Sequence, residues 1–279
     1  MTAPAVVAGV LYAMRARTLG RRLSPWRIVS FYSGLLLLVF AAVSPMDAVA
    51  EDGLFSVHMI QHVVIAEMAA PLIILGLTGP LLQPVLRYRW VRRLEVLTHP
   101  AVALPLWAGV LVFWHIPAML DLALTNPVVH NVQHATFLLS GLILWAPVKE
   151  VLPAPRWFGS GWKALYLLGF WFVCLIMANV FWFSGTPFYS RYEETAPVWG
   201  TSALQDQANA GSVMMATAML LVVPLLVMLF FRMARESEQR QRLIERGLDP
   251  EAVRRAVRYG RGEELARRAD AEDRAAATR

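Results

Sequence analysis

The sequence predicts an all-α protein, a polytopic transmembrane helix bundle of seven spans that continues into a charged helical tail. Three observations support this fold class. Of the 279 residues, 57% are hydrophobic and only 16% are charged, whereas soluble domains are roughly 45–50% apolar and about 25% charged. The charges are uneven, because residues 232–279 hold 23 of the 46 charged side chains. Several apolar stretches also reach about 20 residues, the length that crosses a bilayer as a helix.

Six apolar stretches are long enough to be spans. They are residues 26–44, 54–82, 101–119, 128–148, 163–184 and 209–231. Residues 3–14 form a shorter apolar stretch, which we interpret as a short or tilted first helix. This stretch is not typical of a signal peptide, since its arginines follow it instead of preceding it. We therefore divide the chain into a bundle, 1–231, and a cytoplasmic helical tail, 232–279, interrupted at 247–250.

Loop charges predict the orientation of this bundle. Cytoplasmic loops of membrane proteins carry an excess of Lys and Arg. Twelve of the thirteen basic residues before position 232 fall in 15–27, 87–93 and 149–163, which share one side in a seven-span arrangement. Arg191 is the exception, in an otherwise acidic set of opposite loops. We expect a multi-pass protein of the bacterial plasma membrane with its N-terminus outside and its C-terminus in the cytoplasm.

The composition also excludes several functional classes. Cys174 is the only cysteine, so a disulfide-stabilised secreted scaffold is excluded. The net charge of +6 accompanies basic residues that lie beside apolar stretches. Because this placement is typical of membrane topology signals, we expect the lipid bilayer as a partner and no nucleic acid.

Four of the six histidines form two pairs with i, i+4 spacing. His58 and His62 lie in HMIQH, and His130 and His134 lie in HNVQH. This spacing places both rings of a pair on one face of a helix, about a turn apart. Two such imidazoles can bind one metal ion. Two pairs among six histidines exceed what random placement would give, so we interpret them as a metal site.

The predicted topology gathers five histidines into one layer. The spans that carry the pairs both enter from the acidic side, and His115 lies where another span leaves on that side. A metal site near the extracytoplasmic face is therefore predicted from His58, His62, His115, His130 and His134. The alternative is that each ring only hydrogen-bonds a neighbouring helix. His99 lies on the cytoplasmic side, and we expect a structural or surface role for it.

Imidazole ligands suit zinc, copper, iron and nickel, so other residues must indicate the metal. Met214 falls near the histidine layer, and its thioether would favour Cu(I). Asp47 and Asp206 lie near the outer loops, where a carboxylate can fix a histidine tautomer. Glu67 lies nine residues after His58, on roughly the opposite side of an ideal α-helix. We therefore do not expect Glu67 among the metal ligands.

Taken together, these motifs resemble the CtaG-type assembly factors of bacterial caa-type cytochrome c oxidase. The matching segments run in family order from about residue 26 to 231. They are SPMD at 44–47, HMIQH at 58–62, WHIP at 114–117 with Asp121, HNVQH at 130–134 followed by FLLSGLILWAPV, and Asp206-Gln207 with Gly211 and Met214. The chain departs from the family pattern at Gln133, where an acidic residue is expected, and at Glu67.

The resemblance implies a non-enzymatic, copper-binding chaperone that metallates or stabilises an oxidase subunit in respiratory-chain biogenesis. Its partners would be cytochrome c oxidase subunits or other oxidase assembly factors, and its cofactor would be copper. Two alternatives remain open. Paired histidines on different helices also suit a b-type haem protein, although haem pairs usually need ligands at both membrane depths. Glu67 and Asn179 would suit a small transporter, although no inverted repeat is evident.

Overall fold

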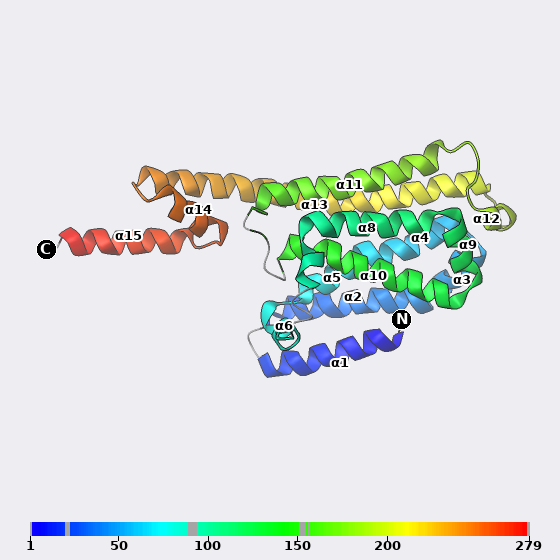
Figure 1. Cartoon of the computed structure of the whole chain (residues 1–279), viewed down its shortest axis with the longest axis horizontal. Coiled ribbons are helices and arrows are strands. Elements are labelled where there is room, and N and C mark those ends of the chain that lie inside the picture. The colour runs from blue at the N-terminus through cyan, green and yellow to red at the C-terminus, as the bar shows by residue number, and fades with distance from the viewer. Residues whose placement is uncertain (1, 20–22, 89–93, 151–154, 156, 278–279) are drawn as a thin grey trace. The chain divides into compact units, whose positions relative to one another are not determined.

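The computed structural model describes residues 2–19, 23–88, 94–150, 155 and 157–277, and these ranges contain helices and no β-strand. The predicted all-α fold class is therefore confirmed for the described part of the chain. The helices form two compact units. The first is Met1–Pro155 with Leu168–Leu221, and the second is Arg156–Leu167 with Val222–Arg279. Figure 1 labels the helices of both units.

The first unit contains most of the helices. In chain order they are α1 (Thr2–Leu19), α2 (Pro25–Val43), α3 (Pro45–Asp52), α4 (Phe55–Val63), the π-helix η2 (Val64–Ala69), α5 (Ala70–Gly76), α6 (Gly79–Leu86), the 3-10 helix η3 (Leu94–Thr98), α8 (Pro100–His115), α9 (Pro117–Thr125), α10 (Pro127–Lys149), α12 (Ser190–Thr195) and the 3-10 helix η4 (Ala196–Trp199). Two long helices, α11 (Ser160–Phe183) and α13 (Ala203–Glu245), contribute residues to both units.

Each of the six long predicted spans coincides with helix, but two end earlier than expected. The span predicted at 54–82 is a continuous helix from α4 through η2 to α5, and it ends at Gly76 because Leu77 is extended. The span predicted at 101–119 ends at His115, where α9 bends away by 72°. Ile116 precedes Pro117 and is extended, since a residue before proline is disfavoured in the α conformation.

Several of these helices are suited to a membrane. Four described segments are long and apolar enough to span it, namely Pro25–Val43, Phe55–Gly76, Ser160–Phe183 and Ala203–Glu245. The bent pair of α8 and α9 would be a fifth. The 23-residue α10 is outside this set, and its first turns carry the polar HNVQH motif. The helices point to a membrane protein, while the seven-span count and the sides of the termini stay predictions.

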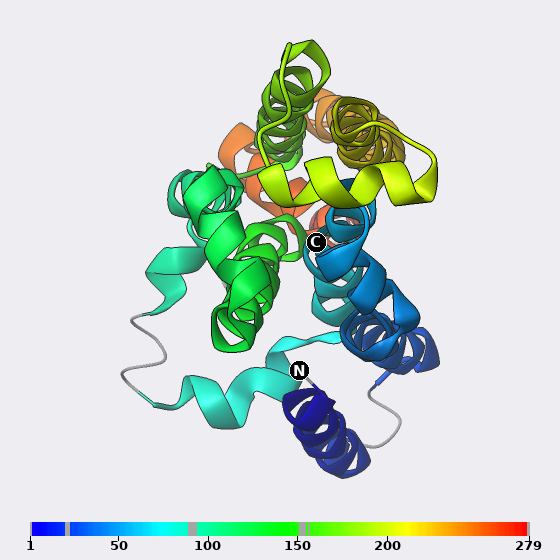
Figure 2. The same ribbon diagram turned by 90° about the vertical axis from the view of Figure 1, so that its right-hand side faces the viewer.

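The first helix is longer than the apolar stretch that predicted it. α1 has 18 residues and packs along α2 at the edge of the first unit (Figure 2). The Tyr12 ring stacks on Phe31 with centroids 3.9 Å apart, and the Tyr32 hydroxyl donates to the Gly9 carbonyl at 2.8 Å. Val6, Val10 and other apolar side chains of α1 are exposed, as expected for a surface that faces lipid.

The π-helix η2 follows directly on the first histidine pair. Its characteristic bond joins the Ala70 amide to the Ile65 carbonyl, five residues earlier. Pro71 begins the next turn and has no N–H to donate to the carbonyl of residue 67 in the α-helical pattern. A π-helix inserts an extra residue into a turn and is found frequently at functional sites. Residues after Val64 are therefore rotated relative to their positions in an ideal α-helix.

Two glycines allow neighbouring helices to approach η2 closely. A Cβ added to Gly34 of α2 would lie 2.8 Å from the Ala69 carbonyl oxygen, and one added to Gly141 of α10 would lie 2.6 Å from the Ala66 carbonyl oxygen. Small residues allow this backbone approach between membrane helices. Because α10 carries the second histidine pair, the Gly141 contact sets the distance between the two histidine-bearing helices.

Gly141→Ala tests this contact. The added methyl group has no space beside the Ala66 carbonyl and Ala70 Cβ, so α10 or η2 must move, at a cost of about 1–3 kcal/mol. We expect a lower melting temperature of the detergent-solubilised protein. Gly109→Ala in α8 is the matched control, since no atom outside its own stretch of helix lies within 4 Å of its Cβ position. An equal effect of the two substitutions would contradict close packing at Gly141.

The second unit contains the charged tail. α13 continues to Glu245, the chain turns at Gly247 with φ 82°, and α14 (Pro250–Arg258) and α15 (Gly262–Ala277) follow. The described tail residues are helical with a turn between α13 and α14, whereas the division of the chain at 231/232 and the cytoplasmic side of the tail stay predictions. Leu243, Val253 and Val257 form a small buried cluster. Exposed pairs with i, i+4 spacing, such as Glu238 with Arg242, lie on the surface of these helices as expected for solvated helices.

Candidate metal centre

The two histidine pairs face each other across the first unit. α4 carries His58 and His62, α10 carries His130 and His134, and the ring centroids within each pair are 4.2 Å apart. Between the helices, the His58 and His130 centroids are 5.9 Å apart and those of His62 and His134 are 5.5 Å apart. All four side chains are buried. The sequence pattern therefore identified four rings that the fold brings together.

The ring spacing can be compared with that of a metal site. A histidine nitrogen lies about 2.0–2.1 Å from a bound ion, so two rings on one ion have centroids at most roughly 6 Å apart. All four spacings fall within this limit. However, no group of three or more His, Cys, Asp or Glu side chains in the described ranges holds its donor atoms in position for an ion. The four rings lie close together, and binding of a metal ion would require them to rotate so that their nitrogen atoms point toward it.

The hydrogen bonding of the rings is incomplete. Both ring nitrogens of His62 and Nε2 of His134 are buried without a hydrogen-bond partner. The His58 ring lies beside the Ala50 carbonyl but lacks hydrogen-bond geometry with it. Leaving a buried polar group unsatisfied costs about 1–3 kcal/mol. The alternative prediction, in which each ring hydrogen-bonds a neighbouring helix, does not describe His62.

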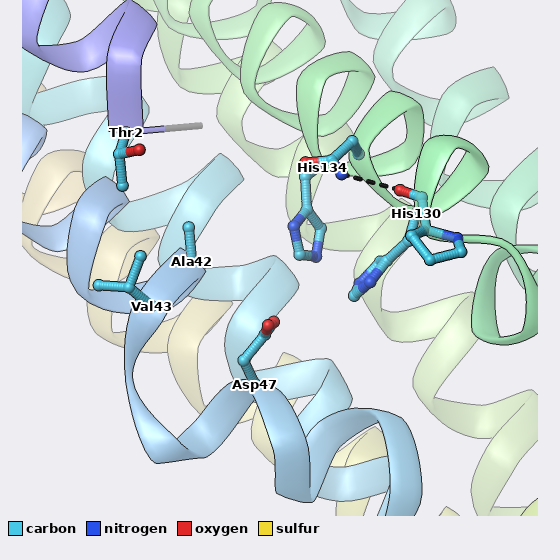
Figure 3. A pocket seen from close by; sticks show the side chains of 8 residues that line it. Thr2, Ala42, Val43, Asp47, His130 and His134 are labelled. Atoms are coloured by element: carbon cyan, nitrogen blue, oxygen red, sulfur yellow. Dashed lines mark hydrogen bonds between the residues drawn. The ribbon is translucent and has the colours of Figure 1, made fainter.

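A cavity of about 300 Å³ opens beside the second pair. Its polar lining residues are Thr2, Asp47, His130, Asn131 and His134. Figure 3 shows the Asp47 carboxylate and the two imidazoles turned toward the same space. Asp47 also accepts a hydrogen bond from Nε2 of Gln61, which donates to the Ala41 carbonyl at 2.8 Å as well. Asp47 therefore combines a negative charge at the cavity with a link to the helix that carries the first pair.

His115 lies at the edge of the cluster. Its ring centroid is 6.5 Å from that of His62, and its Nδ1 lies 2.6 Å from the Leu111 carbonyl, to which it donates. The Tyr189 hydroxyl donates to the His115 carbonyl at 2.9 Å. Burial and, second, the negative charge of Asp121 raise the pKa of Tyr189, so this phenol stays protonated and keeps its bond. His115 is thus tied to the protein more firmly than His62, whose ring makes no hydrogen bond.

Asp206 contacts the start of the helix that carries the first histidine pair. Its carboxylate accepts bonds from the Phe55 amide at 2.6 Å, the Ser56 amide at 3.2 Å and the Ser56 hydroxyl at 2.5 Å. These groups form the first turn of α4, whose own N-cap residue, Leu54, provides no side-chain cap. Asp206 therefore caps the histidine-bearing helix from α13. The neighbouring Gln207 accepts a hydrogen bond from the Phe188 amide at 2.8 Å.

A second, smaller cavity lies deeper between the helices. Its volume is about 10 Å³, and its lining includes His62, Met59, Met214 and Glu67. Glu67 was expected on the side opposite His58 from ideal α-helical geometry. The structure places Glu67, which follows the irregular turn of η2, at the same cavity as His62, and His58 is not among the residues that line it. Met214, predicted near the histidine layer, lies at this inner cavity.

Three other polar residues, His99, Gln61 and Gln133, have defined positions in the structure. His99 accepts a hydrogen bond from the Ala101 amide at the start of α8, so its expected structural role is confirmed. Gln61 and Gln133, to which the sequence pattern assigned no role, are fully buried. Each glutamine immediately precedes the second histidine of its HxxQH segment, and this shared position was a signal in the sequence. Both amide atoms of Gln133 lack a hydrogen-bond partner.

Comparison with known proteins gives one match. The model of a sequence family described as cytochrome c oxidase caa3 assembly factor (Caa3_CtaG) matches residues 10–236. No curated protein and no solved structure matches the chain. The matched region contains both histidine pairs, Asp47, Asp206 and the lining residues of the two cavities except Thr2.

Proposed function

The chain belongs to the cytochrome c oxidase caa3 assembly factor family, and we propose that it contributes to oxidase assembly as a membrane-embedded copper chaperone. The family suggests a non-catalytic role and a membrane setting shared with oxidase subunits. In this proposal, copper is cargo that the chain binds and passes to an oxidase subunit or to another assembly factor. The site would face the extracytoplasmic side, as the loop charges predict.

The observation that supports this proposal most strongly is the environment of the His62 ring. Its ring is buried, has no hydrogen bond on either nitrogen, and lies within 6.5 Å, between centroids, of three other histidines. Ionisable residues inside membrane helices are expensive and usually functional. A copper ion would supply the missing partner for these nitrogens, and imidazole is a good copper ligand.

The residues suggest how copper would be held and released. His58, His62, His130 and His134 would supply the nitrogen ligands, and Asp47 would attract a cation into the outer cavity by its negative charge. Because both ring nitrogens of His62 and Nε2 of His134 lack a hydrogen bond, these two rings can turn toward an ion and later release it to another set of ligands. Such exchange moves the ion without chemical turnover, as expected of a chaperone.

Metal analysis of the purified protein tests the proposal. Protein purified anaerobically and without chelators is expected to retain copper, and deletion of its gene is expected to lower oxidase activity until the gene is restored. Purified protein without copper would refute the metal assignment. A sharp α-band in the reduced visible spectrum would instead indicate a b-type haem protein.

A further inference from the structure

The inner cavity differs from the outer cavity in size and in chemistry. With a volume of about 10 Å³, it has room for about one water-sized occupant. Its polar and sulfur-containing lining residues are His62, Glu67, Met59 and Met214, and the remaining walls are apolar, including Trp107 and Phe137. The cavity is therefore a small space in an apolar surrounding, lined by four side chains that can each donate an electron pair.

Glu67 is the residue that most requires a partner. It is 3% exposed, and its Oε2 is buried without a hydrogen bond. A buried carboxylate in a membrane helix is normally paired with another group, because an isolated charge there costs several kcal/mol. No Lys or Arg is among the described residues that line this cavity. A cation in the cavity would provide the missing partner.

The other lining residues indicate which cation fits. Met59 and Met214 are each 1% exposed, so their thioethers are held inside the protein. Thioether and imidazole ligands select soft ions such as Cu(I). A monovalent ion beside one carboxylate leaves no net charge in the apolar interior, whereas a divalent ion would leave one positive charge. The combination favours Cu(I) over zinc or Cu(II).

His62 connects this cavity with the outer one. It lines the inner cavity, and its ring is 5.5 Å, between centroids, from that of His134, which lines the outer cavity. We propose that the inner cavity is a second Cu(I)-binding position, formed by His62, Met59, Met214 and Glu67, to which an ion passes from the outer histidines through His62. When both positions are filled, His62 binds the inner ion and His58, His130 and His134 hold the outer one, because a neutral imidazole donates through one nitrogen only. This inference rests on the proposed copper function. The ion keeps its oxidation state, since only its ligands change.

Cu(I) binding by the full-length protein, measured by anaerobic equilibrium dialysis, tests the inner position. We expect about two ions per wild-type chain and about one in Met59→Leu/Met214→Leu, which removes both thioethers at nearly constant volume. His130→Ala/His134→Ala should also retain about one ion, now in the inner position with sulfur ligands detectable by X-ray absorption. Adding Glu67→Gln to His130→Ala/His134→Ala keeps the shape of the side chain and removes its charge. This change should weaken the binding of the remaining ion about tenfold or more.

Met68→Leu is the matched control, because Met68 adjoins Glu67 in η2 but is 40% exposed. It should bind copper as the wild type does. A wild-type chain that binds one ion, with no loss in Met59→Leu/Met214→Leu and no sulfur signal, would overturn the inner position and leave the proposed function intact. A wild-type chain that binds no Cu(I) would overturn both.

Discussion

Replacing both His62 and His134 by alanine is expected to abolish copper retention while the helices stay folded. The double substitution removes the ring that links the two cavities and the α10 histidine whose centroid lies 5.5 Å from it. His62 makes no hydrogen bond through its ring, so its loss removes packing and no polar interaction. We expect copper content below detection after anaerobic purification, with an unchanged helical circular dichroism spectrum.

His99→Ala is the control for this double substitution. His99 is also a histidine near a helix end, but it caps α8 through the Ala101 amide and lies outside the cluster. Its replacement should leave the copper content unchanged and should cost about 0.5–2 kcal/mol of stability, as loss of a helix cap does. If the double variant kept wild-type copper content, the histidine pairs would not be the site.

The paired histidines were predictable because their signal is local. An i, i+4 pair faces one side of a helix whatever the helix contacts, and Asn126 and Pro127 define where the second histidine-bearing helix begins. That α4 and α10 lie side by side depends on close contacts such as that of Gly141 with Ala66. These contacts join residues far apart in the sequence. The sequence pattern alone could therefore suggest that the two histidine pairs lie at a similar depth in the membrane, but it could not give the distance between them.

The position of Glu67 was not predictable from helical periodicity. A count of 3.6 residues per turn places it opposite His58, whereas η2 changes that count within the same span. Pro71 was visible in the sequence, but proline allows a kink, a break or a π-turn, and packing decides among them. The inner cavity and the role of Met214 at it depend on this one irregular turn.

The role of Asp206 was not predictable either, because it acts over 150 residues of sequence. An acidic residue near an outer loop is usually solvated, and the segment before Phe55 shows no capping residue of its own. Only the fold brings the carboxylate to the start of α4, where three donors meet it. The capping interaction that usually lies within one segment here joins α13 to α4.

Asp206→Ala is therefore expected to have a large effect on stability and a secondary effect on copper binding. The substitution leaves the Phe55 and Ser56 amides without their partner, at a cost of about 1–3 kcal/mol for a buried group. The first turn of α4 should fray, and His58, three residues after Phe55, should lose its fixed position. We expect a lower melting temperature, faster hydrogen exchange at residues 55–58 and weaker copper binding.

Asp249→Ala provides the comparison, since Asp249 caps α14 in the tail by accepting from the Ala252 amide at 2.7 Å. It should destabilise the tail and leave copper binding unchanged. If Asp206→Ala left both α4 exchange and copper affinity at wild-type values, the cap would have no part in positioning the histidines.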